Sequence, residues 1–524
     1  MTDAMTLEDI LAQDFHALPE LIRLHALQRP RHIALSQEAR SLDYRQLDAL
    51  ADRAAASLQR DGLRAGQAIA VCAATSIEYA VIFIGALRAG LAVAPLAPTS
   101  TAGAIANMVA DAQAPLLFLD AGVANALEPV REKIVARSVA LDDGGAGESF
   151  QHWFAPAGAA PAAVVAAPHA PFNLIYSSGT TGTPKGIVQS NLMRWRQWQR
   201  ATAYDYQPDS ITIVSTPLYS NTTLVSFLPT LAMGATAVLM EKFDALRFLE
   251  LAQQWRATTA MLVPVQYSRI MALPEFERYD LTSFRAKFCT SAPFSAQLKA
   301  DIVKRWPGRL IEYYGMTEGG GTCVLEANLH PDKLHTVGRP APDHDIRLID
   351  EQGSELPPGS TGEVVGHSEG IMTGYHNQPA KTAEAQWHDA TGRRFIRTGD
   401  IGRFDDDGFL ILMDRKKDMI ISGGFNVYPS DLEAVLRAHV DVAEAAVVGV
   451  PSERWGETPV AFVVPKRRDA LLSKTLLDWT NNQLGKTQRL AAIEFVETLP
   501  RNAIGKVLKR ELRDTYKANA AILS

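Results

Sequence analysis

Apolar residues recur at two different spacings up to about residue 310, and the two spacings alternate along the chain. Asp43 and Gln46 have the spacing of a helix capping box, and apolar residues then recur at helical intervals to Leu58. The short apolar run 68–73 predicts a buried strand, and residues 77–87 predict the next helix. Alternation of strands and helices predicts a layered α/β architecture for this part of the chain.

The pattern changes after residue 340. Short alternating runs between glycines and prolines, at 337–365, predict a small β-subdomain. A charge cluster at 414–418 precedes a last block, which opens with a capping box at Ser430–Glu433 and continues to an apolar strand at 445–450. We therefore predict a multidomain α/β protein, with a large N-terminal domain at 1–414 and a small α+β C-terminal domain at 415–524.

Composition excludes several classes of protein. The 524 residues are 47% hydrophobic and 21% charged, with a net charge of −6, so no global basic field favours nucleic acid. The three cysteines form no CxxC pair and are expected to be buried thiols. The N-terminus lacks the pattern of a signal peptide, and no apolar run is long enough to span a bilayer. These features predict a cytoplasmic protein without an integral membrane segment.

The segment 176–186, Tyr-Ser-Ser-Gly-Thr-Thr-Gly-Thr-Pro-Lys-Gly, is the most informative of the chain. Glycines let backbone N–H groups approach an anion, hydroxyls add donors, and Lys185 supplies positive charge, which indicates a phosphate-binding loop. A flexible linker has a similar composition, but it does not explain the apolar run that precedes the loop. The segment is not a Walker A loop, because no Gly-Lys-Ser/Thr ends it.

This loop resembles the signature loop of adenylate-forming enzymes, which include acyl- and aryl-CoA synthetases, peptide-synthetase adenylation domains and luciferases. Five later segments resemble that family's motifs in the same order: Glu312–Glu318 for adenine and magnesium, Arg397–Asp400 for ribose, Asp414–Asp418 for the interdomain hinge, Ser422–Pro429 for the thioester step and Pro500–Lys506 for the catalytic lysine. The likeness covers nearly the whole chain and is closest to the acyl- and aryl-CoA ligases.

The resemblance implies an ATP site. Thr180, Thr181 and Lys185 are expected to hold the β- and γ-phosphates. Thr317 is expected to contact the α-phosphate, and Glu318 to ligate Mg²⁺ together with phosphate oxygens and water. The full set of residues expected to bind ATP or AMP is Ser177, Ser178, Gly179, Thr180, Thr181, Gly182, Thr183, Lys185, Ser291, Ala292, Pro293, Glu312, Tyr313, Tyr314, Gly315, Met316, Thr317, Asp400, Arg415 and Lys506.

Within this set, Tyr314 is expected to stack on adenine, opposite the segment 291–293. Asp400 is expected to accept hydrogen bonds from the ribose, and Arg415 to reach the ribose or a phosphate. Lys506 is expected to bridge the attacking carboxylate and the α-phosphate, because two anions react and their charge must be neutralised. The residues expected to act in catalysis are thus Lys506, Thr317, Glu318 and Lys185.

The resemblance also implies that the small C-terminal domain is mobile and serves two half-reactions. Lys417 is expected at the hinge. Gly423 and Gly424 are expected to let the pantetheine arm of coenzyme A pass close to the backbone, and Trp455 to lie near the thiol. For Trp455 an ordinary packing role fits the sequence equally well.

The acid pocket departs from the family pattern. Many relatives have a histidine after a Pro-Leu-aromatic sequence, whereas this chain has Ser220. Neither an aspartate for an amino group nor an arginine for a second carboxylate occurs in the segments expected to line the pocket, which favours an apolar monocarboxylic acid, aromatic, cyclic or aliphatic. The expected pocket residues are Tyr219, Ser220, Asn221, Gln266, Gly315 and Gly320.

The predicted activity is that of an acyl-CoA synthetase, which uses ATP and Mg²⁺ to form an acyl-adenylate and then transfers the acyl group to coenzyme A. Two alternatives stay open: a stand-alone ligase that loads a carrier protein, and a non-catalytic nucleotide-binding scaffold. A luciferase-like oxidation is a remote third. The expected partners are small molecules, and the sequence is also compatible with a homodimer.

Overall fold

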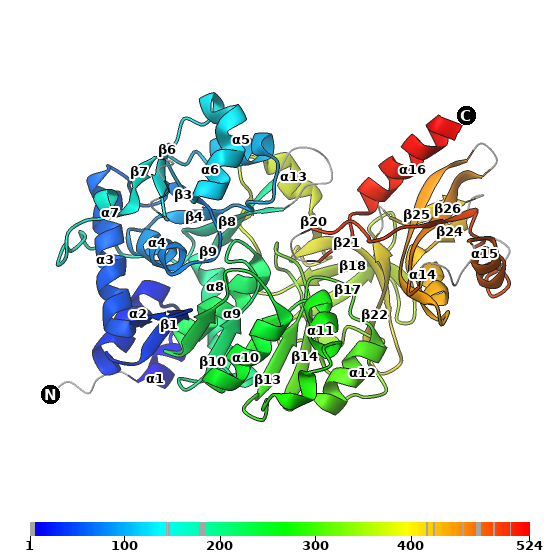
Figure 1. The fold of residues 1–524 in the computed structure, drawn as a ribbon, viewed down its shortest axis with the longest axis horizontal. Coiled ribbons are helices and arrows are strands. Elements are labelled where there is room, and N and C mark those ends of the chain that lie inside the picture. The colour runs from blue at the N-terminus through cyan, green and yellow to red at the C-terminus, as the bar shows by residue number, and fades with distance from the viewer. Residues whose placement is uncertain are drawn as a thin grey trace. The chain divides into compact units, whose positions relative to one another are not determined.

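The computed structural model describes residues 6–142, 144, 147–177, 185–415, 418–422, 425–452, 455–467, 473–485, 488–502 and 505–523. The chain forms two compact units, and Figure 1 labels many of their helices and strands. Unit 1 comprises residues 1–345 and 366–396, and unit 2 comprises 346–365 and 397–524. Residues 397–414 thus belong to the same unit as the C-terminal residues, while a movable domain that begins at residue 415 stays a prediction.

Unit 1 contains two large sheets. The first consists of β1 Ile33–Gln37, β2 Arg40–Asp43, β10 Ile211–Val214, β11 Thr236–Leu239, β12 Thr259–Leu262, β13 Ala286–Cys289, β14 Arg309–Tyr314, β15 Cys323–Glu326 and β16 Arg339–Pro340. Their order is β16-β15-β14-β13-β12-β10-β11-β1-β2, parallel from β14 to β1 and antiparallel at both edges.

The second sheet consists of β3 Ala68–Cys72, β4 Ala92–Pro95, β5 Leu116–Leu119, β6 Arg137–Ala140, β7 Glu148–Ser149, β8 Pro171–Ser177, β9 Lys185–Ser190 and β19 Gly374–Tyr375. Its order is β19-β9-β8-β4-β3-β5-β6-β7. Strand β9 lies between β8, which precedes the predicted phosphate loop, and β19, which comes from much later in the chain. It runs antiparallel to both.

Helices alternate with these strands, as the sequence predicts. They are α1 Leu7–Leu11, α2 Leu18–Gln28, α3 Tyr44–Arg60, α4 Ile77–Arg88, α5 Ala102–Asp111, α6 Ala121–Leu127, α7 Phe150–Trp153, α8 Asn191–Gln199, α9 Asn221–Ala232, α10 Ala245–Trp255, α11 Pro264–Met271, α12 Ala296–Arg305 and α13 Pro379–Glu384, with 3₁₀ turns at Glu128–Lys133, Ala201–Tyr204 and Phe276–Arg278. The predicted capping box at Asp43 and Gln46 is confirmed at the start of α3.

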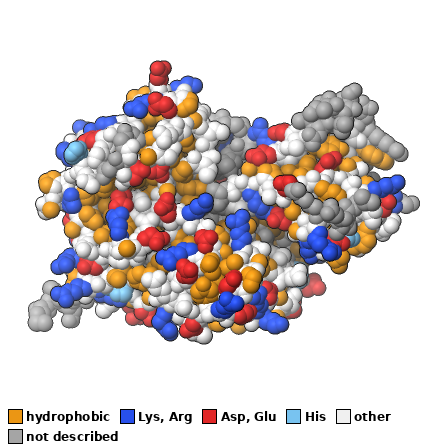
Figure 2. All heavy atoms as spheres, in the orientation of Figure 1, with side chains coloured by type: hydrophobic (Ala, Val, Ile, Leu, Met, Phe, Trp, Pro, Cys, Tyr) orange, Lys and Arg blue, Asp and Glu red, His pale blue; other side chains and the backbone are white. Residues whose placement is uncertain are grey.

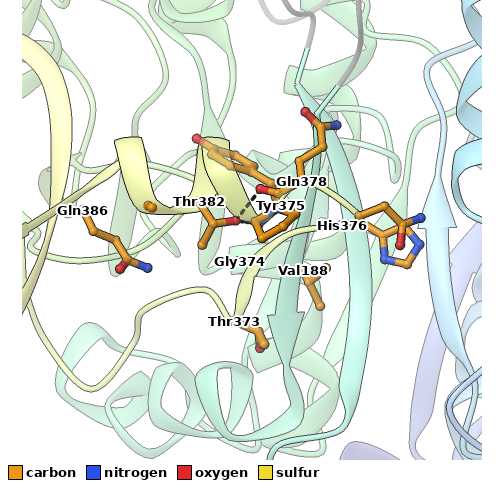
Figure 3. A pocket seen from close by; sticks show the side chains of 11 residues that line it. Val188, Thr373, Gly374, Tyr375, His376, Gln378, Thr382 and Gln386 are labelled. Carbon is orange, nitrogen blue, oxygen red and sulfur yellow. Dashed lines mark hydrogen bonds between the residues drawn. The ribbon is translucent and has the colours of Figure 1, made fainter.

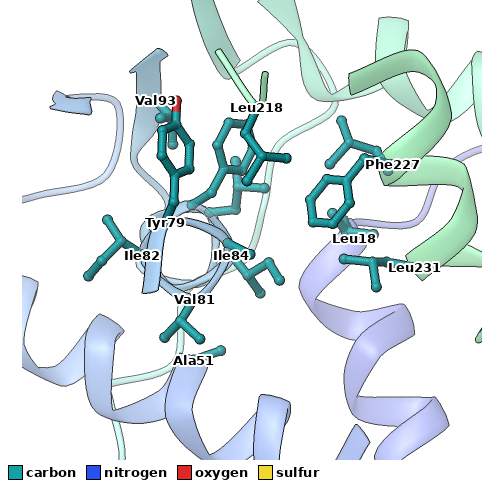
Figure 4. Close-up of a cluster of buried hydrophobic side chains, with 14 of the residues drawn as sticks. Leu18, Ala51, Tyr79, Val81, Ile82, Ile84, Val93, Leu218, Phe227 and Leu231 are labelled. Atoms are coloured by element: carbon teal, nitrogen blue, oxygen red, sulfur yellow. The ribbon is translucent and has the colours of Figure 1, made fainter. Parts of the chain in front are cut away.

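The main core of unit 1 surrounds helix α4. Almost every residue of α4 is buried, as expected of a helix that is apolar on all sides. Figure 4 shows Tyr79, Val81, Ile82 and Ile84 leaving this helix in different directions, with side chains of other elements around them. Burial of each such apolar side chain contributes about 1.5–3 kcal/mol to the stability of the fold. The packing around α4 therefore stabilises unit 1.

The remaining strands form two smaller sheets. One consists of β17 Asp345–Ile349, β18 Thr361–His367, β20 Gln386–His388, β21 Arg394–Phe404 and β22 Leu410–Arg415. The other lies in unit 2 and consists of β23 Ile420–Ser422, β24 Phe425–Val427, β25 Val442–Ser452, β26 Gly456–Pro465 and β27 Ala492–Phe495, accompanied by α14 Pro429–Arg437, α15 Ser473–Asn481 and α16 Lys509–Leu523. The β-rich texture predicted after residue 337 is confirmed.

One local prediction is wrong. Helix α14 begins at Pro429 with Tyr428 at its N-cap, and Ser430 does not cap it. The backbone N–H of Ser430 instead donates to the Asp414 carboxylate at 2.9 Å, while Glu433 accepts from the Val447 N–H at 2.9 Å. A proline is well suited to the first helical position, and the acceptor for this helix start comes from another strand, which local spacing could not reveal.

The three cysteines are buried free thiols, as the sequence predicts. Residues 155–170 contain neither helix nor strand and are mostly exposed. Charged side chains of both signs are interspersed on the face shown in Figure 2, in keeping with the absence of a strong net field.

Candidate active site

The predicted phosphate loop connects two paired strands. Strands β8 and β9 are antiparallel neighbours, with Ser177 opposite Lys185. This confirms that an apolar strand leads into the loop and shows that the chain returns beside it. Residues 178–184, which include Ser178, Gly179, Thr180, Thr181, Gly182 and Thr183, lie outside the described residues, so their expected phosphate contacts stay predictions. The backbone of Ser177 belongs to β8, and Lys185 is the first residue of β9.

Tyr375 brings together two residues that the sequence places far apart. Its hydroxyl donates to Oε1 of Glu318 at 2.9 Å, and the ammonium of Lys185 lies 4.9 Å from the centre of its ring. Burial, followed by the nearby Glu318 carboxylate, raises the pKa of Tyr375, so its hydroxyl stays protonated as a donor. The expected phosphate-binding lysine and the expected magnesium ligand thus share one aromatic neighbour.

Sequence reasoning missed Tyr375. It lies in the short strand β19, which pairs with β9, and Tyr375 stands opposite Ile187 in that register. It also lines a surface depression of about 500 Å³ formed by residues 373–379 and neighbouring side chains (Figure 3). Only the long-range pairing of β19 with β9 gives Tyr375 its place, and no local spacing signals it.

The backbone around Thr317 and Glu318 is fixed from two sides. The carbonyl of Thr317 accepts from Nε2 of Gln189 at 2.6 Å, and the carbonyl of Glu318 accepts from the Met372 N–H at 2.8 Å. Gly319 forms a bridge with Ile371. The two expected catalytic residues therefore lie on a segment held between strand β9 and residues 371–372.

The expected adenine site has one strained residue. Ser291 has φ +83°, an uncommon backbone conformation for a residue with a side chain, and its hydroxyl lies 2.5 Å from that of Thr222 in α9. Strain of this kind is concentrated at functional sites. Tyr314 is the last residue of β14, in keeping with an adenine contact, but that contact, like those of Ala292, Pro293, Gly315 and Met316, stays a prediction.

Two residues expected at the nucleotide have side chains committed to the core. Glu312 is buried and forms an ion pair with the buried ammonium of Lys299. Tyr313 stacks on Phe288, with ring centres 5.8 Å apart, and meets Tyr204 edge-on at 5.4 Å. Desolvation raises the pKa of both Glu312 and Tyr313. Their roles in nucleotide binding stay predictions, and these contacts give both side chains a role in packing.

At the expected acid pocket, two of the residues have local structural partners. Ser220 caps α9, because its hydroxyl accepts from the Thr222 N–H at 3.3 Å. Gln266 is buried near the start of α11, where its oxygen accepts from the Val263 N–H at 3.1 Å and its nitrogen donates to the Ser215 carbonyl at 3.2 Å. Both side chains therefore hold the backbone of the expected pocket by hydrogen bonds.

The other expected pocket residues differ in how closely their neighbours surround them. Tyr219 is half-buried, and its side chain is hydrogen-bonded to Thr99. Gly320 has φ +85°, and a Cβ there would lie 2.7 Å from the Gly366 carbonyl oxygen, so any larger residue would strain the backbone. Gly315 tolerates a Cβ better, with Thr322 Oγ1 at 3.3 Å as its nearest neighbour.

Unit 2 contains the expected ribose residues as a pair. Asp400 in β21 stands opposite Arg415 in β22, and Nε of Arg415 lies 3.1 Å from Oδ1 of Asp400. The Asp400 side chain is 12% exposed and that of Arg415 is 38% exposed, so the arginine is the more accessible of the two. The contacts of both residues with the ribose stay predictions.

Lys506 lies at the end of a tight turn. Its N–H donates to the Asn502 side chain at 2.8 Å, and its carbonyl accepts from the Asn502 N–H at 2.9 Å. Arg501 pairs with Val507 across this turn and donates to the Gly505 carbonyl at 2.7 Å. Gly505 has φ +78°, which a glycine adopts without strain. The turn therefore presents Lys506, which is partly exposed, at a defined position.

Three expected residues of the second half-reaction, Lys417, Gly423 and Gly424, lie outside the described residues. Trp455 is 47% exposed in a turn before β26. An indole with this much exposed surface lies outside the core, and its contact with coenzyme A stays a prediction.

Sequence comparison agrees with this geometry. The profile of the family described as AMP-binding enzyme matches residues 22–376, and that of its C-terminal domain matches residues 431–506. The chain belongs to the AMP-binding enzyme family. Within that family, it is an adenylate-forming enzyme of the acyl- and aryl-CoA ligase group, an ATP-binding, AMP-forming ligase. The resemblance inferred from the motifs is thereby confirmed, as is the mixed α/β fold.

Relatives of this AMP-binding enzyme differ in their acids and acceptors. It is 33% identical to a fatty acid–[acyl-carrier-protein] ligase, ScoC, of Streptomyces coeruleorubidus, over 96% of this chain and 97% of that protein. It is 31% identical to an indoleacetate–CoA ligase of Aromatoleum aromaticum, over 95% and 97%. The ATP-bound structure of MatB from Rhodopseudomonas palustris superposes with a TM-score of 0.85 at 29% identity, covering 96% of this chain and 99% of that one.

The donor set of the AMP-binding enzyme fits Mg²⁺. Within the described ranges, no group of three or more His, Cys, Asp or Glu side chains is arranged to hold a metal ion. Mg²⁺ is usually bound by one or two carboxylates, with substrate phosphates and water completing its shell, and Glu318 offers one carboxylate oriented by Tyr375. No helix among the described residues combines the length and hydropathy needed to cross a bilayer.

Proposed function

We propose that this enzyme is an AMP-forming acyl-CoA synthetase that activates a monocarboxylic acid with an apolar body. A carboxylate oxygen attacks the α-phosphorus of ATP and the bond to pyrophosphate breaks. The coenzyme A thiolate then attacks the acyl carbon and AMP leaves. The observation that supports this most strongly is the convergence of Lys185 and Glu318 on Tyr375.

The residues divide the work of the first half-reaction. Lys185 offers positive charge to the terminal phosphates, and Asp400 offers an acceptor to the ribose. Lys506 would neutralise the carboxylate and the α-phosphate as they approach, which is the main barrier between two anions. Mg²⁺, when bound at Glu318, would offset charge on the phosphates.

The preference for one carboxylate has structural support. Arg194 in α8 contacts the expected acid pocket, because Nη2 donates to Asn221 Oδ1 at 2.9 Å. Its guanidinium is fully buried, and it also donates to Asn173 and Gln197. Arg194 therefore lies behind Asn221 and has little capacity left for a second carboxylate of a substrate.

The proposal is tested by measuring pyrophosphate and AMP release across a panel of aromatic, cyclic and aliphatic acids, with and without coenzyme A. We expect pyrophosphate release to need ATP, Mg²⁺ and an acid, and AMP release to accelerate with coenzyme A. ADP and phosphate as the only products would show γ-phosphoryl transfer and refute the proposal.

A carrier-protein ligase is the second candidate, because the ScoC relative has that activity by name. The two candidates share the first half-reaction and differ only in the acceptor thiol. A parallel assay with a phosphopantetheinylated carrier protein separates them, since coenzyme A would then leave AMP release unchanged while the carrier protein accelerates it.

A further inference from the structure

A chain of polar side chains, buried except at the Asn221 end, crosses unit 1 from helix α9 to the segment after β14. The Arg194 guanidinium donates to Asn221 Oδ1 at 2.9 Å and, through Nε, to Asn173 Oδ1 at 3.2 Å. Asn173 Nδ2 donates to Gln189 Oε1 at 3.0 Å, and Gln189 Nε2 donates to the Thr317 carbonyl at 2.6 Å. Four side chains and one carbonyl thus form a continuous path between two parts of the expected active site.

Burying these polar side chains costs free energy of folding. Asn173, Gln189 and Arg194 are fully buried, and among the described residues no carboxylate forms an ion pair with Arg194. Desolvation lowers the pKa of Arg194 to about 9. Another buried cation of unit 1, Lys299, is by contrast paired with Glu312. The guanidinium also lies over the Phe172 ring, 5.7 Å from its centre. Well-packed apolar residues are often at least as stable as a buried charge, so stability alone is a weak reason for Arg194.

Arg194 gives the path a direction. A guanidinium has donors only, so Asn173 must turn its oxygen toward Arg194 and its nitrogen toward Gln189. Gln189 must then turn its oxygen toward Asn173 and its nitrogen toward Thr317. One buried cation therefore fixes the orientation of two amides in series, and the last amide can only donate to the Thr317 carbonyl.

We propose that Arg194, acting through Asn173 and Gln189, is a positioning residue for Thr317, and that the same guanidinium holds Asn221 at the start of α9. The proposal rests on the proposed function, in which Thr317 contacts the α-phosphate and Asn221 lines the acid pocket. The network would then keep the two reactants of adenylation at a fixed separation, since small displacements of positioning groups cost large factors in rate.

The central variant is Gln189→Met, which keeps the size of the side chain and removes both of its hydrogen bonds. We expect the kcat of ATP–pyrophosphate exchange, per folded enzyme, to fall by about 10- to 100-fold. Thioester formation from synthetic acyl-adenylate and coenzyme A should stay within about threefold of the parent, because the α-phosphate bond is already made. Equal losses in both half-reactions, or an unchanged exchange rate, would overturn the proposal.

Lys287→Met is the matched control. Lys287 is also a fully buried basic residue of unit 1, and its side-chain nitrogen donates to the carbonyls of residues 306–308. We expect this variant to lower the melting temperature at least as much as Gln189→Met while leaving exchange per folded enzyme unchanged. A selective loss of exchange in Lys287→Met would show that any buried polar group has this effect, and would overturn a specific role for the network.

Two further variants keep the test decisive if Gln189→Met does not fold. Gln189→Glu keeps the shape and the acceptor for Asn173, but it places an oxygen against the Thr317 carbonyl, so the same selective loss is expected. Asn221→Ala removes the side chain at the partly exposed end of the path. If the path acts as a unit, the double variant with Gln189→Glu should lose less exchange activity than the product of the two single losses. Multiplicative losses would overturn the relay. A parent enzyme that forms no adenylate with any acid would refute the proposed function itself.

Discussion

The expected catalytic groups of unit 1 and unit 2 are held in different ways. In unit 1, Glu318 meets Tyr375, 57 residues away, and the Thr317 carbonyl meets Gln189, 128 residues away. In unit 2, Lys506 is hydrogen-bonded to Asn502 four residues before it, at the end of one turn. The groups of unit 1 thus depend on its whole fold, whereas the backbone of Lys506 is hydrogen-bonded within its own short segment.

This difference has a consequence for the two half-reactions. Groups that depend on a whole fold keep a fixed geometry, which suits the binding of ATP and acid. A lysine on a local turn can be presented to or withdrawn from a site as one piece without loss of its own geometry. The comparison therefore supports the prediction that Lys506 serves adenylation alone, and four experiments can break or sharpen it.

The largest effect is expected from Lys506→Ala. Loss of one transition-state donor costs about 10²- to 10³-fold, so ATP–pyrophosphate exchange should fall by at least about 10²-fold. Thioester formation from synthetic acyl-adenylate should persist. Lys474→Ala, which removes an exposed lysine of the same unit, is the control and should leave both half-reactions unchanged. If Lys506→Ala damages both half-reactions equally, the lysine is not confined to adenylation.

The reverse selectivity is expected from Lys417→Pro. The resemblance places Lys417 at the interdomain hinge, and proline fixes φ near −65° and restricts the residue before it. Adenylation should persist while transfer to coenzyme A falls by about tenfold or more. A tenfold loss requires only that the proline raise the barrier to domain rearrangement by about 1.4 kcal/mol. Lys417→Ala, which leaves the backbone free, should retain both activities. Retained transfer in the proline variant would show that no rotation at this residue is required.

A smaller effect is expected from Tyr375→Phe, which tests the fixed geometry of unit 1. The ring near Lys185 stays, but the hydrogen bond to Glu318 is lost. Hydrogen bonds to charged groups contribute about 1.5–3 kcal/mol, so exchange should fall by about 10- to 100-fold and the half-saturating Mg²⁺ concentration should rise. Tyr204→Phe is the control, because Tyr204 packs edge-on against Tyr313 in the core. An unchanged Mg²⁺ dependence would show that Tyr375 does not orient Glu318.

The sequence predicted the local features of this molecule well. The capping box of α3, the strand at β3, the helix at α4 and the strand before the phosphate loop all follow from residue spacing, because neighbours in sequence determine them. The motifs identified the family because their order is specific.

The contacts between distant segments could not be predicted in this way. Tyr375 depends on the pairing of β19 with β9, and the network of Arg194 depends on β8, β9 and α8 lying side by side. The start of α14 was mispredicted for the same reason, since Asp414 of another strand provides its acceptor. Local spacing contains no information on such pairings, and these are the contacts that orient the expected site.

The smallest effect concerns the stability of unit 1 and its dependence on pH. His25 is buried, donates its Nε2–H to the Ala232 carbonyl, 2.8 Å away, and lies against Gly234. Desolvation lowers the pKa of His25 to about 4 from 6.5. Below pH 6.5 the unfolded chain therefore takes up a proton that the folded chain does not. Stability should be lost as the pH falls from 6.5 to 4 and should be unaffected by this group above 6.5.

His25→Gln isolates this contribution, because glutamine can keep a bond to the Ala232 carbonyl and does not titrate. Between pH 7 and pH 5 the parent should lose about 2 kcal/mol more stability than the variant. Each 1 kcal/mol shifts the melting temperature by about 2–4 °C in domains of 150–250 residues and by less in larger ones, so the expected difference in this protein is a few degrees. Melting curves of parent and variant at both pH values measure it. Parallel losses in the two proteins would show that His25 is not the group that couples the fold of unit 1 to pH.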